Sequence, residues 1–270
     1  MKKGLLLGFI ALFVVLLTAC GGEEESTEGL LSDGKLTVGV TAGPHEEIME
    51  KVAELGADEG IEIELQVFSD YVMPNRALSE GEIDLNSFQT EPFLDDANAE
   101  RDLGLVKVAD TVTFPMGIYS EEITDLGELQ DGAVIGFPND PTQGGRALLL
   151  FEQAGLITLK EDAGVSATAN DIVENPHNFE FLELDAAQLP VQLGELDAAA
   201  INSNFAMEAG LMPGKDSIFV EQDSPYVNLL VTREEDKDDE AVQQVIDLYH
   251  SEEVKQFVEE RFEGSVIPGW

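Results

Sequence analysis

Apolar and polar residues alternate along this chain at two spacings, which predict strands and helices in turn. Residues 36–40 and 61–67 alternate residue by residue, as strands with one exposed face do. Residues 45–58, between them, carry apolar side chains three and four positions apart, which is typical of an amphipathic helix. This strand–helix–strand unit predicts a parallel pair of strands with a right-handed crossover.

The pattern continues to residue 113 and restarts after residues 114–119. We expect further strands at residues 81–86, 105–113, 133–137, 179–184, 198–202, 217–220 and 226–232. We expect a short helix that ends at residue 80 and further helices at residues 93–101, 145–154, 169–174, 187–193, 205–209, 240–249 and 252–262. The restart indicates two α/β lobes rather than one extended sheet.

Polar or aromatic residues follow several of the expected strands. They include Tyr71, residues 88–89, Asn139 and residues 202–204. Open α/β sheets bind ligands beyond the carboxyl ends of their strands. If the two lobes face each other, these residues surround one cleft, so the pattern favours a ligand site between the lobes.

One arginine occupies an unusual place in the second set of elements. Arg146 follows a Gly-Gly pair and falls in the first turn of the helix expected at residues 145–154. The helix dipole disfavours a cation there, whereas the free backbone N–H groups favour an anion. A ligand carboxylate held by the arginine fork would account for this placement. A salt bridge to one of the many nearby acids would account for it equally well.

The first twenty residues have the pattern of a secretory signal. Two lysines precede an apolar run at residues 5–17, which is too short to span a bilayer comfortably. Cys20, the only cysteine of the chain, stands where a bacterial lipobox has its lipidated cysteine. By that resemblance, residues 1–19 are a cleaved signal and residues 20–34 a lipidated acidic tether. An ordinary signal peptide with a coincidental cysteine is the alternative.

Acidic residues dominate the composition. Without residues 1–19 the chain has 12 Lys and Arg against 55 Asp and Glu, a net charge of −43. This balance argues against nucleic acids and anionic headgroups as partners of the protein surface. The hydrophobic fraction of 43% indicates that the chain nevertheless folds. We interpret the charge as a surface adapted to high salt, which screens its self-repulsion.

The sequence contains no catalytic constellation. His45 lacks the second histidine of a zinc-protease helix, and no nucleophile elbow or phosphate-binding loop is present. His45, His177 and His250 are expected on exposed, separate elements. The acidic run at residues 234–240 has no glycine at the spacing of a calcium loop, so we interpret it as a solvated charge run. No enzyme activity, metal or cofactor is expected.

A series of ordered segments is the most specific signal in the sequence. The segments are residues 37–45, 68–72, 86–89, 114–120, 138–142, 144–150, 171–176, 186–190, 200–202 and 224–228. Together they resemble the NlpA lipoprotein family, the methionine-binding lipoproteins of bacterial importers, over nearly the whole of residues 35–270.

The resemblance implies a periplasmic-binding-protein-like α/β fold, in which two lobes are joined by two crossing segments and close on the ligand. One lobe would comprise residues 35–115 and 223–270, and the other residues 116–222. The family's function would be capture of L-methionine outside the membrane and its delivery to an ABC permease and ATPase on other chains. The protein would be held at the extracytoplasmic face of the cell membrane by the lipid on Cys20.

The resemblance also assigns polar contacts to the ligand. Arg146 would bind the carboxylate, and Asn202 and Asn228 the backbone polar groups. These types are suitable because a zwitterion that leaves water needs a fork for its carboxylate and oxygen acceptors for its ammonium group. The alternative for each asparagine is a hydrogen bond to local backbone at a turn or strand end.

Aromatic residues would enclose the ligand side chain, since a thioether packs well against aromatic edges. By resemblance these are Tyr71, Phe88 and Tyr119, although Tyr71 and Phe88 are also explained as core residues. Many family members have a histidine and a tyrosine where this chain has Thr90 and Phe93. The side-chain end therefore matches less well than the carboxylate end, and another apolar amino acid or a short methionine peptide stays open.

A protein of another class, a surface interaction lipoprotein, is the second hypothesis. It would not need Arg146, Asn202 and Asn228 to converge on one cavity. The convergence of these three side chains therefore discriminates between the two hypotheses.

Overall fold

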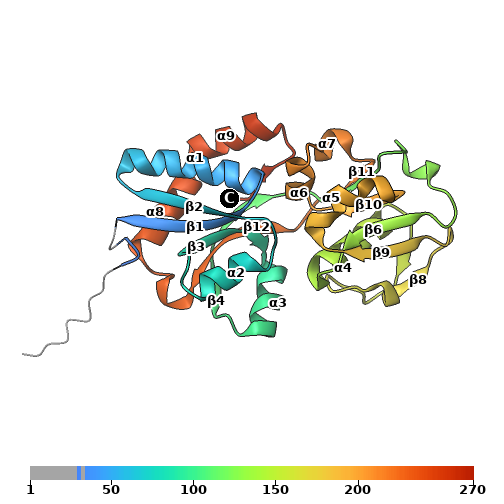
Figure 1. Ribbon diagram of the computed structural model, residues 1–270, viewed down its shortest axis with the longest axis horizontal. Coiled ribbons are helices and arrows are strands. Elements are labelled where there is room, and N and C mark those ends of the chain that lie inside the picture. Colours follow the sequence, from blue (N-terminus) through green and yellow to red (C-terminus); the bar gives the residue numbers. More distant parts are fainter. Residues whose placement is uncertain (1–28, 32–33) are drawn as a thin grey trace, which may run out of the picture.

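Two β-sheets with their covering helices form two lobes along the long axis of the molecule (Figure 1). The structure is a computed structural model and describes residues 29–31 and 34–270. The predicted signal at residues 1–19, Cys20 and most of the tether lie outside the described residues. The prediction of a two-lobed α/β fold is confirmed.

The sheet of the first lobe has the strand order β13-β4-β12-β3-β1-β2. Its strands are β1 (Lys35–Thr41), β2 (Glu62–Phe68), β3 (Leu85–Thr90), β4 (Leu105–Thr113), β12 (Val227–Arg233) and β13 (Ile267–Pro268). β1 pairs in parallel with β2 from Lys35 opposite Glu62 to Thr41 opposite Phe68, as the sequence predicts. β12 inserts antiparallel between β3 and β4, which ties the C-terminal part of the chain into this lobe.

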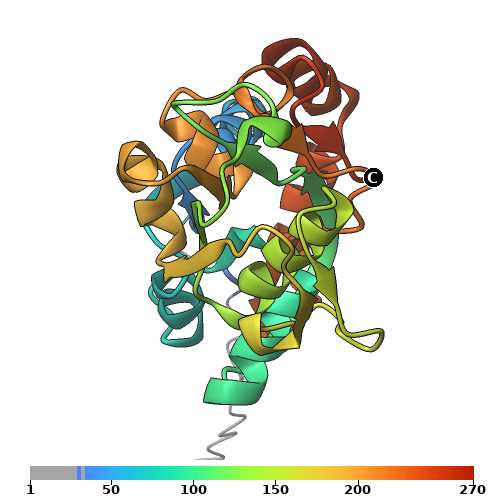
Figure 2. The ribbon, with the colours of Figure 1, turned by 90° about the vertical axis from the view of Figure 1, so that its right-hand side faces the viewer.

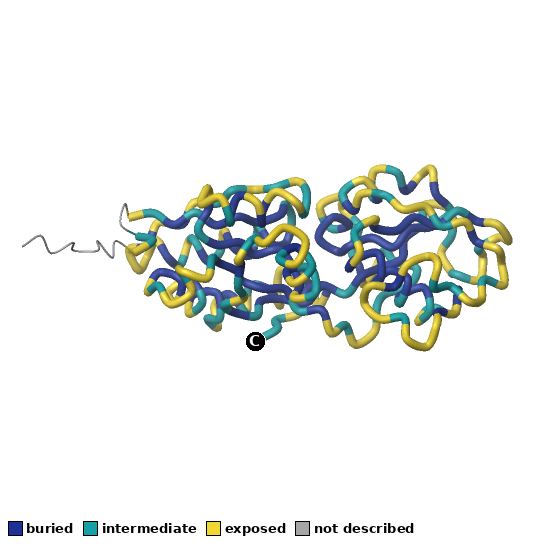
Figure 3. The backbone as a smooth tube through the Cα atoms, turned by 90° about the horizontal axis from the view of Figure 1, so that it is seen from below, coloured by how far each residue is buried: buried dark blue, intermediate teal, exposed yellow. Residues whose placement is uncertain are grey.

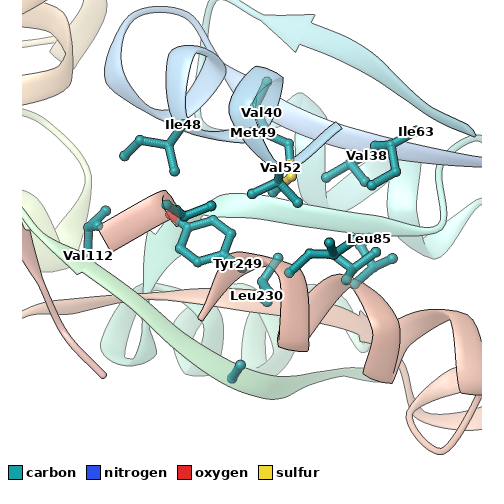
Figure 4. Close-up of a cluster of buried hydrophobic side chains, with 14 of the residues drawn as sticks. Val38, Val40, Ile48, Met49, Val52, Ile63, Leu85, Val112, Leu230 and Tyr249 are labelled. Carbon is teal, nitrogen blue, oxygen red and sulfur yellow. The ribbon is translucent and has the colours of Figure 1, made fainter. Parts of the chain in front are cut away.

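Helices cover both faces of the first sheet. They are α1 (Pro44–Glu59), α8 (Glu240–Tyr249) and α9 (Glu252–Phe262) on one face, and α2 (Met73–Ser79) and α3 (Glu91–Arg101) on the other. The first three pack on the larger core, in which Val38, Ile48 and Tyr249 are buried (Figure 4). Successive side chains of β12 point to opposite faces of the sheet, so Leu230 joins this core and Leu229 joins the core under α2.

The sheet of the second lobe has the order β11-β5-β10-β6-β9. Its strands are β5 (Gly117–Tyr119), β6 (Val134–Pro138), β9 (Glu180–Leu184), β10 (Ala198–Ile201) and β11 (Phe219–Val220). Its helices are α4 (Pro141–Gln153) on one face and α5 (Leu189–Gln192) and α6 (Ser203–Glu208) on the other, with α7 (Pro213–Asp216) before β11. Short 3-10 turns lie at Leu126–Glu128, Ala169–Asp171, Ala186–Gln188 and Leu193–Glu195, and a further one follows β12 at Glu234–Asp236.

Two crossing segments join the lobes. The chain leaves the first sheet after Thr113 and returns to it at Val227, after β11 of the second sheet. The C-terminal helices therefore belong to the first lobe. In the end-on view the second lobe faces the viewer, and these helices do not lie in front of it (Figure 2). Buried backbone gathers in two groups, one for each lobe (Figure 3).

Three predicted elements differ from the structure. The strand expected at residues 81–86 runs instead from Leu85 to Thr90, because its polar residues are buried between β1 and β12 and give no alternation. The helix expected at residues 169–174 is a 3-10 turn, Ala169–Asp171, followed by β8 (Ile172–Glu174), which pairs with β7 (Thr158–Leu159). The helix expected at residues 187–193 is broken into short turns around α5.

Candidate functional site

A small cavity lies between the lobes. The first lobe and its outgoing crossing contribute His45, Tyr71, Phe88, Gln89, Thr90, Phe93, Phe114 and Asn228 to the lining. The second lobe contributes Gln143, Arg146, Asn202, Ser203 and Asn204. The carboxyl ends of strands from both sheets thus meet at one site, as the sequence predicts.

Arg146 is buried in this lining and is held by both crossing segments. Its Nε and Nη2 donate to the two carboxylate oxygens of Glu221 at 3.1 and 2.5 Å. Nη2 also donates to the Phe114 carbonyl at 2.7 Å and to Ser224 at 3.2 Å. The guanidinium lies 4.4 Å from the ring centroid of Tyr226. The salt bridge that the sequence left open therefore exists, and its partner is Glu221.

The predicted position of Arg146 within its helix is wrong. α4 begins at Pro141, after Asp140, whose carboxylate accepts a backbone N–H of the first turn. Arg146 is therefore in the second turn, where the helix dipole has little effect on a cation. Gly145 lies inside the helix. A larger residue would not fit there, because an added Cβ would lie 2.1 Å from the Val165 carbonyl oxygen. The glycine pair allows a close approach and does not start the helix.

Two asparagines predicted to bind the ligand also line the cavity. Asn202 Nδ2 donates to Gln143 Oε1 at 2.7 Å, and Asn228 Nδ2 donates to the Val112 carbonyl at 3.0 Å. Both amides are thereby oriented, and their oxygens remain available as acceptors. Asn202 Oδ1 is buried and has no partner among the described residues. The bond from Asn228 crosses to the neighbouring strand, so it is not the local turn bond that was the alternative.

Three aromatic rings form one side of the cavity. Tyr71, Phe88 and Phe93 lie with their ring centroids 5.9 Å apart in each pair, in tilted and edge-to-face arrangements. Thr90 adds a buried hydroxyl that has no partner in the described chain. Tyr71 also crosses to the second lobe, where its hydroxyl donates to Asn204 Oδ1 at 2.6 Å.

Tyr119 does not belong to this wall, and the prediction that it does is wrong. Its ring is buried in the second lobe's core with Leu189 and Phe205. Successive residues of β5 point to opposite faces of the sheet, so Ile118 joins the core under α4 and Tyr119 the core under α5.

Six lining residues were not assigned to the site from the sequence. They are His45, Gln89, Phe114, Gln143, Ser203 and Asn204. The available signal was their position just beyond predicted strands, and it flagged residues 88–89 and 202–204 without giving them roles.

His45 is the clearest correction among them. It was expected on an exposed element but is only 2% exposed, because α1 starts at Pro44, directly beyond the end of β1. Its ring packs edge-on against Phe114, with the centroids 4.7 Å apart. Burial lowers the pKa of His45 to about 3, so the imidazole is neutral at physiological pH.

The electrostatics of the lining suit a ligand without net charge. Arg146 is the only formally charged side chain in the lining of this cavity, and Glu221 balances it. His45 adds no charge. An amino acid is a zwitterion with zero net charge, so its burial here leaves no uncompensated charge.

Residues 29–31 and 34–270 contain no group of three His, Cys, Asp or Glu side chains placed to hold a metal ion. Within the same residues no helix has both the length and the apolarity needed to cross a membrane.

Comparison with known proteins decides the family. The family model of the NlpA lipoproteins matches residues 36–270. The chain belongs to the NlpA lipoprotein family. This match includes every residue that lines the cavity.

Individual relatives are similar along their full length. Outer membrane lipoprotein 3 of Mannheimia haemolytica is 43% identical over 272 residues, with all of both chains covered. The D-methionine-binding lipoprotein MetQ of Escherichia coli K12 is 42% identical over 271 residues, which cover 99% of this chain and 96% of the relative. The structure also resembles that of a nutrient binding protein from Burkholderia cenocepacia bound to methionine. Its TM-score is 0.85 at 42% identity, over 87% of this chain and 100% of the other.

Proposed function

We propose that this NlpA-family protein captures methionine outside the membrane and delivers it to an ABC transporter. The observation that carries the proposal is the convergence of Arg146, Asn202 and Asn228 with a three-ring aromatic wall on one cavity between two lobes. Relatives similar along their full length are named methionine-binding proteins, and one similar structure was solved with methionine.

The geometry supports one orientation of the ligand. The hydrogen bonds of Arg146 to described residues use Nε and Nη2, which leaves Nη1 for the carboxylate. The oxygens of Asn202 and Asn228 suit the ammonium group. The thioether would then lie against Phe88 and Phe93, where a polarizable side chain gains from ring contacts.

Isothermal titration calorimetry on the purified protein tests this function. We expect heat with L-methionine and a weaker response to leucine, whose branched side chain fits the ring wall less well. D-methionine should be titrated in the same experiment, because relatives are named D-methionine-binding lipoproteins. If neither methionine enantiomer gives heat but another amino acid or a methionine peptide does, the ligand is that compound and not methionine.

The second hypothesis, a surface interaction lipoprotein without a ligand, loses its support at the cavity. Such a protein does not need buried polar atoms without hydrogen-bond partners between its lobes. Asn202 and Asn204 each have one such atom within the described chain. Failure of every amino acid and methionine peptide to bind would restore this hypothesis.

The membrane attachment is proposed from the sequence. Cys20 would carry the lipid, and residues 20–34 would tether the lobes to the extracytoplasmic face of the cell membrane. In cells, a Cys20→Ala variant should move from the membrane fraction to the soluble extracytoplasmic fraction. A variant that stays in the membrane fraction would contradict lipidation at Cys20.

The partners follow from the function. A permease on another chain would accept the ligand, and an ATPase would drive the transport. One solved relative from Coxiella burnetii is described as the periplasmic substrate-binding protein of an ABC transporter. Uptake of labelled methionine by cells that lack this protein should fall and should recover when the gene is restored.

A further inference from the structure

Asn204 is a cavity residue whose amide has one bonded end and one free end. Its side chain is 4% exposed, and its Oδ1 accepts a hydrogen bond of 2.6 Å from the Tyr71 hydroxyl. Its Nδ2 is buried and has no partner among residues 29–31 and 34–270. Asn204 lines the cavity, so this N–H group is a donor that a ligand in the cavity could satisfy.

The bond to Tyr71 fixes the orientation of this amide. A separation of 2.6 Å is typical of an O–H···O hydrogen bond and short for N–H···O. Burial raises the pKa of the Tyr71 phenol, so its hydroxyl keeps the proton that it donates. The amide oxygen of Asn204 therefore faces Tyr71, and the amide nitrogen faces away from it.

Asn202 presents the opposite polarity two residues earlier. Its nitrogen donates to Gln143, and its buried oxygen is the end without a partner in the described chain. An ammonium group can only donate hydrogen bonds, and a carboxylate can only accept them. The free oxygen of Asn202 therefore matches a ligand ammonium group, and the free N–H of Asn204 matches a ligand carboxylate.

We propose that Asn204 is a ligand-binding residue that donates to the ligand carboxylate beside Arg146, and that Tyr71 sets its polarity from the opposite lobe. The inference rests on the proposed function, the capture of an amino acid. It adds a second carboxylate donor and gives Tyr71 a role beyond that of an aromatic wall.

The position of the Tyr71–Asn204 bond couples ligand binding to lobe closure. Tyr71 lies between β2 and α2 of the first lobe, and Asn204 lies in α6 of the second. The bond therefore forms only when the lobes are close together. When they separate, the Asn204 amide loses the contact that orients it, and its hold on the carboxylate weakens. Closure and carboxylate binding stabilise each other.

Substitution of Asn204 by aspartate tests the donor role. Asn204→Asp keeps an oxygen that accepts from Tyr71 but replaces the N–H group with a second oxygen, which repels a carboxylate. By calorimetry we expect about 100-fold weaker binding of L-methionine. L-methioninamide, which has a neutral carboxamide in place of the carboxylate, should lose about 10-fold or less. Asn204→Ala adds no charge and should show the same preference if the aspartate variant does not fold.

Removal of the Tyr71 hydroxyl tests the orienting role. Tyr71→Phe keeps the ring, including its contact with Phe205 at 4.8 Å between centroids. We expect dissociation of labelled methionine, measured in a chase experiment, to be about 10-fold faster. The rate of association should change by less than about 3-fold, because the bond forms only after the ligand has entered.

Matched controls separate these effects from charge and stability. Asn178→Asp adds the same charge at an exposed position, and Tyr249→Phe removes a buried hydroxyl from the core of the first lobe. Both should bind methionine within about 2-fold of wild type. If wild type binds no amino acid, the proposed function itself is wrong. If wild type binds but Asn204→Asp binds within about 3-fold of it, or loses methioninamide equally, only the role of Asn204 is overturned.

Discussion

The two lobes contribute different chemistry to the same cavity. All five lining residues of the second lobe are polar, whereas every aromatic ring in the lining comes from the first lobe or its outgoing crossing. The polar side chains are held by directional bonds, such as that from Asn202 to Gln143. The rings of Phe88 and Phe93 are held by packing with Tyr71 and with each other, and Tyr71 in addition donates a hydrogen bond to Asn204.

This difference predicts unequal tolerance to substitution. A directional bond is lost completely when one partner changes, and a buried group left without a partner costs additional free energy. A packed wall can adjust to a side chain of similar volume. We therefore expect the polar residues of the second lobe, together with Asn228 of the first lobe, to determine whether an α-amino acid binds. The aromatic rings of the first lobe should determine which side chain is preferred.

The largest effect is expected at Arg146. Arg146→Ala should weaken methionine binding by about 1,000-fold or more, because it removes a desolvated charge from the polar end. It also leaves Glu221 buried without its partner, so the free energy of unfolding should fall by about 3–5 kcal/mol. Calorimetry and urea denaturation measure the two effects.

Two further variants separate stability from binding. Adding Glu221→Gln to Arg146→Ala should restore part of the stability, because it removes the unpaired buried charge. It should restore none of the binding, because the arginine that binds the ligand carboxylate is still absent. Arg76→Ala breaks an exposed pair with Glu80 and should change neither. Methionine affinity of Arg146→Ala within tenfold of wild type would contradict the role of Arg146.

A second effect, of a few kcal/mol in stability, is expected at His45. Its pKa is about 3 in the folded protein and about 6.5 in the unfolded chain. Between these values only the unfolded state takes up the proton, so the free energy of unfolding falls as the pH falls. The expected decrease is about 1.4 kcal/mol per pH unit from this residue. Urea denaturation of wild type and His45→Gln at pH 6 and 5 should show this difference in slope, and parallel slopes would contradict it.

A smaller effect on binding is expected in the aromatic wall. Phe88→Leu keeps most of the apolar volume but loses ring contacts with Tyr71 and Phe93, so methionine binding should weaken by about 10-fold. Binding of leucine should change less, since it gains less from the ring. A loss as large as that in Arg146→Ala would remove the distinction between the two lobes.

The smallest effect is expected at Thr90. Thr90→Val replaces a buried hydroxyl, which has no partner in the described chain, with a methyl group of similar size. Methionine binding should stay within about 3-fold of wild type or improve. Thermal unfolding should occur at the same or a higher temperature. A loss of tenfold or more by calorimetry would show that the hydroxyl binds the ligand side chain.

Much of the fold was predictable because its strands and helices have clear periods. α8 and α9 carry strong apolar stripes, and their observed bounds equal the predicted ones. β3 was misplaced because its polar residues Asn86 and Gln89 are buried and bonded to Asn75 within the first lobe. Periodicity cannot identify a polar strand that satisfies its side chains internally.

The site was predictable as far as residue type and family resemblance allow. Arg146 and the two predicted asparagines line the cavity, but the sequence did not indicate that Glu221 pairs with Arg146, because the two are far apart in the chain. The bond between Tyr71 and Asn204 depends on how the lobes close, and the burial of His45 depends on its packing at the start of α1 against Phe114. Such contacts follow from tertiary packing and leave no local pattern in the sequence.

A crystal structure with selenomethionine as the only ligand would show directly how the amino acid lies in the cavity. No lining residue of the cavity contains sulfur, so the anomalous signal of selenium locates the ligand side chain without ambiguity. We expect a selenium peak beside the rings of Phe88 and Phe93, with the carboxylate at Arg146 and Asn204. A selenium peak beside Arg146, or none in the cavity, would contradict it.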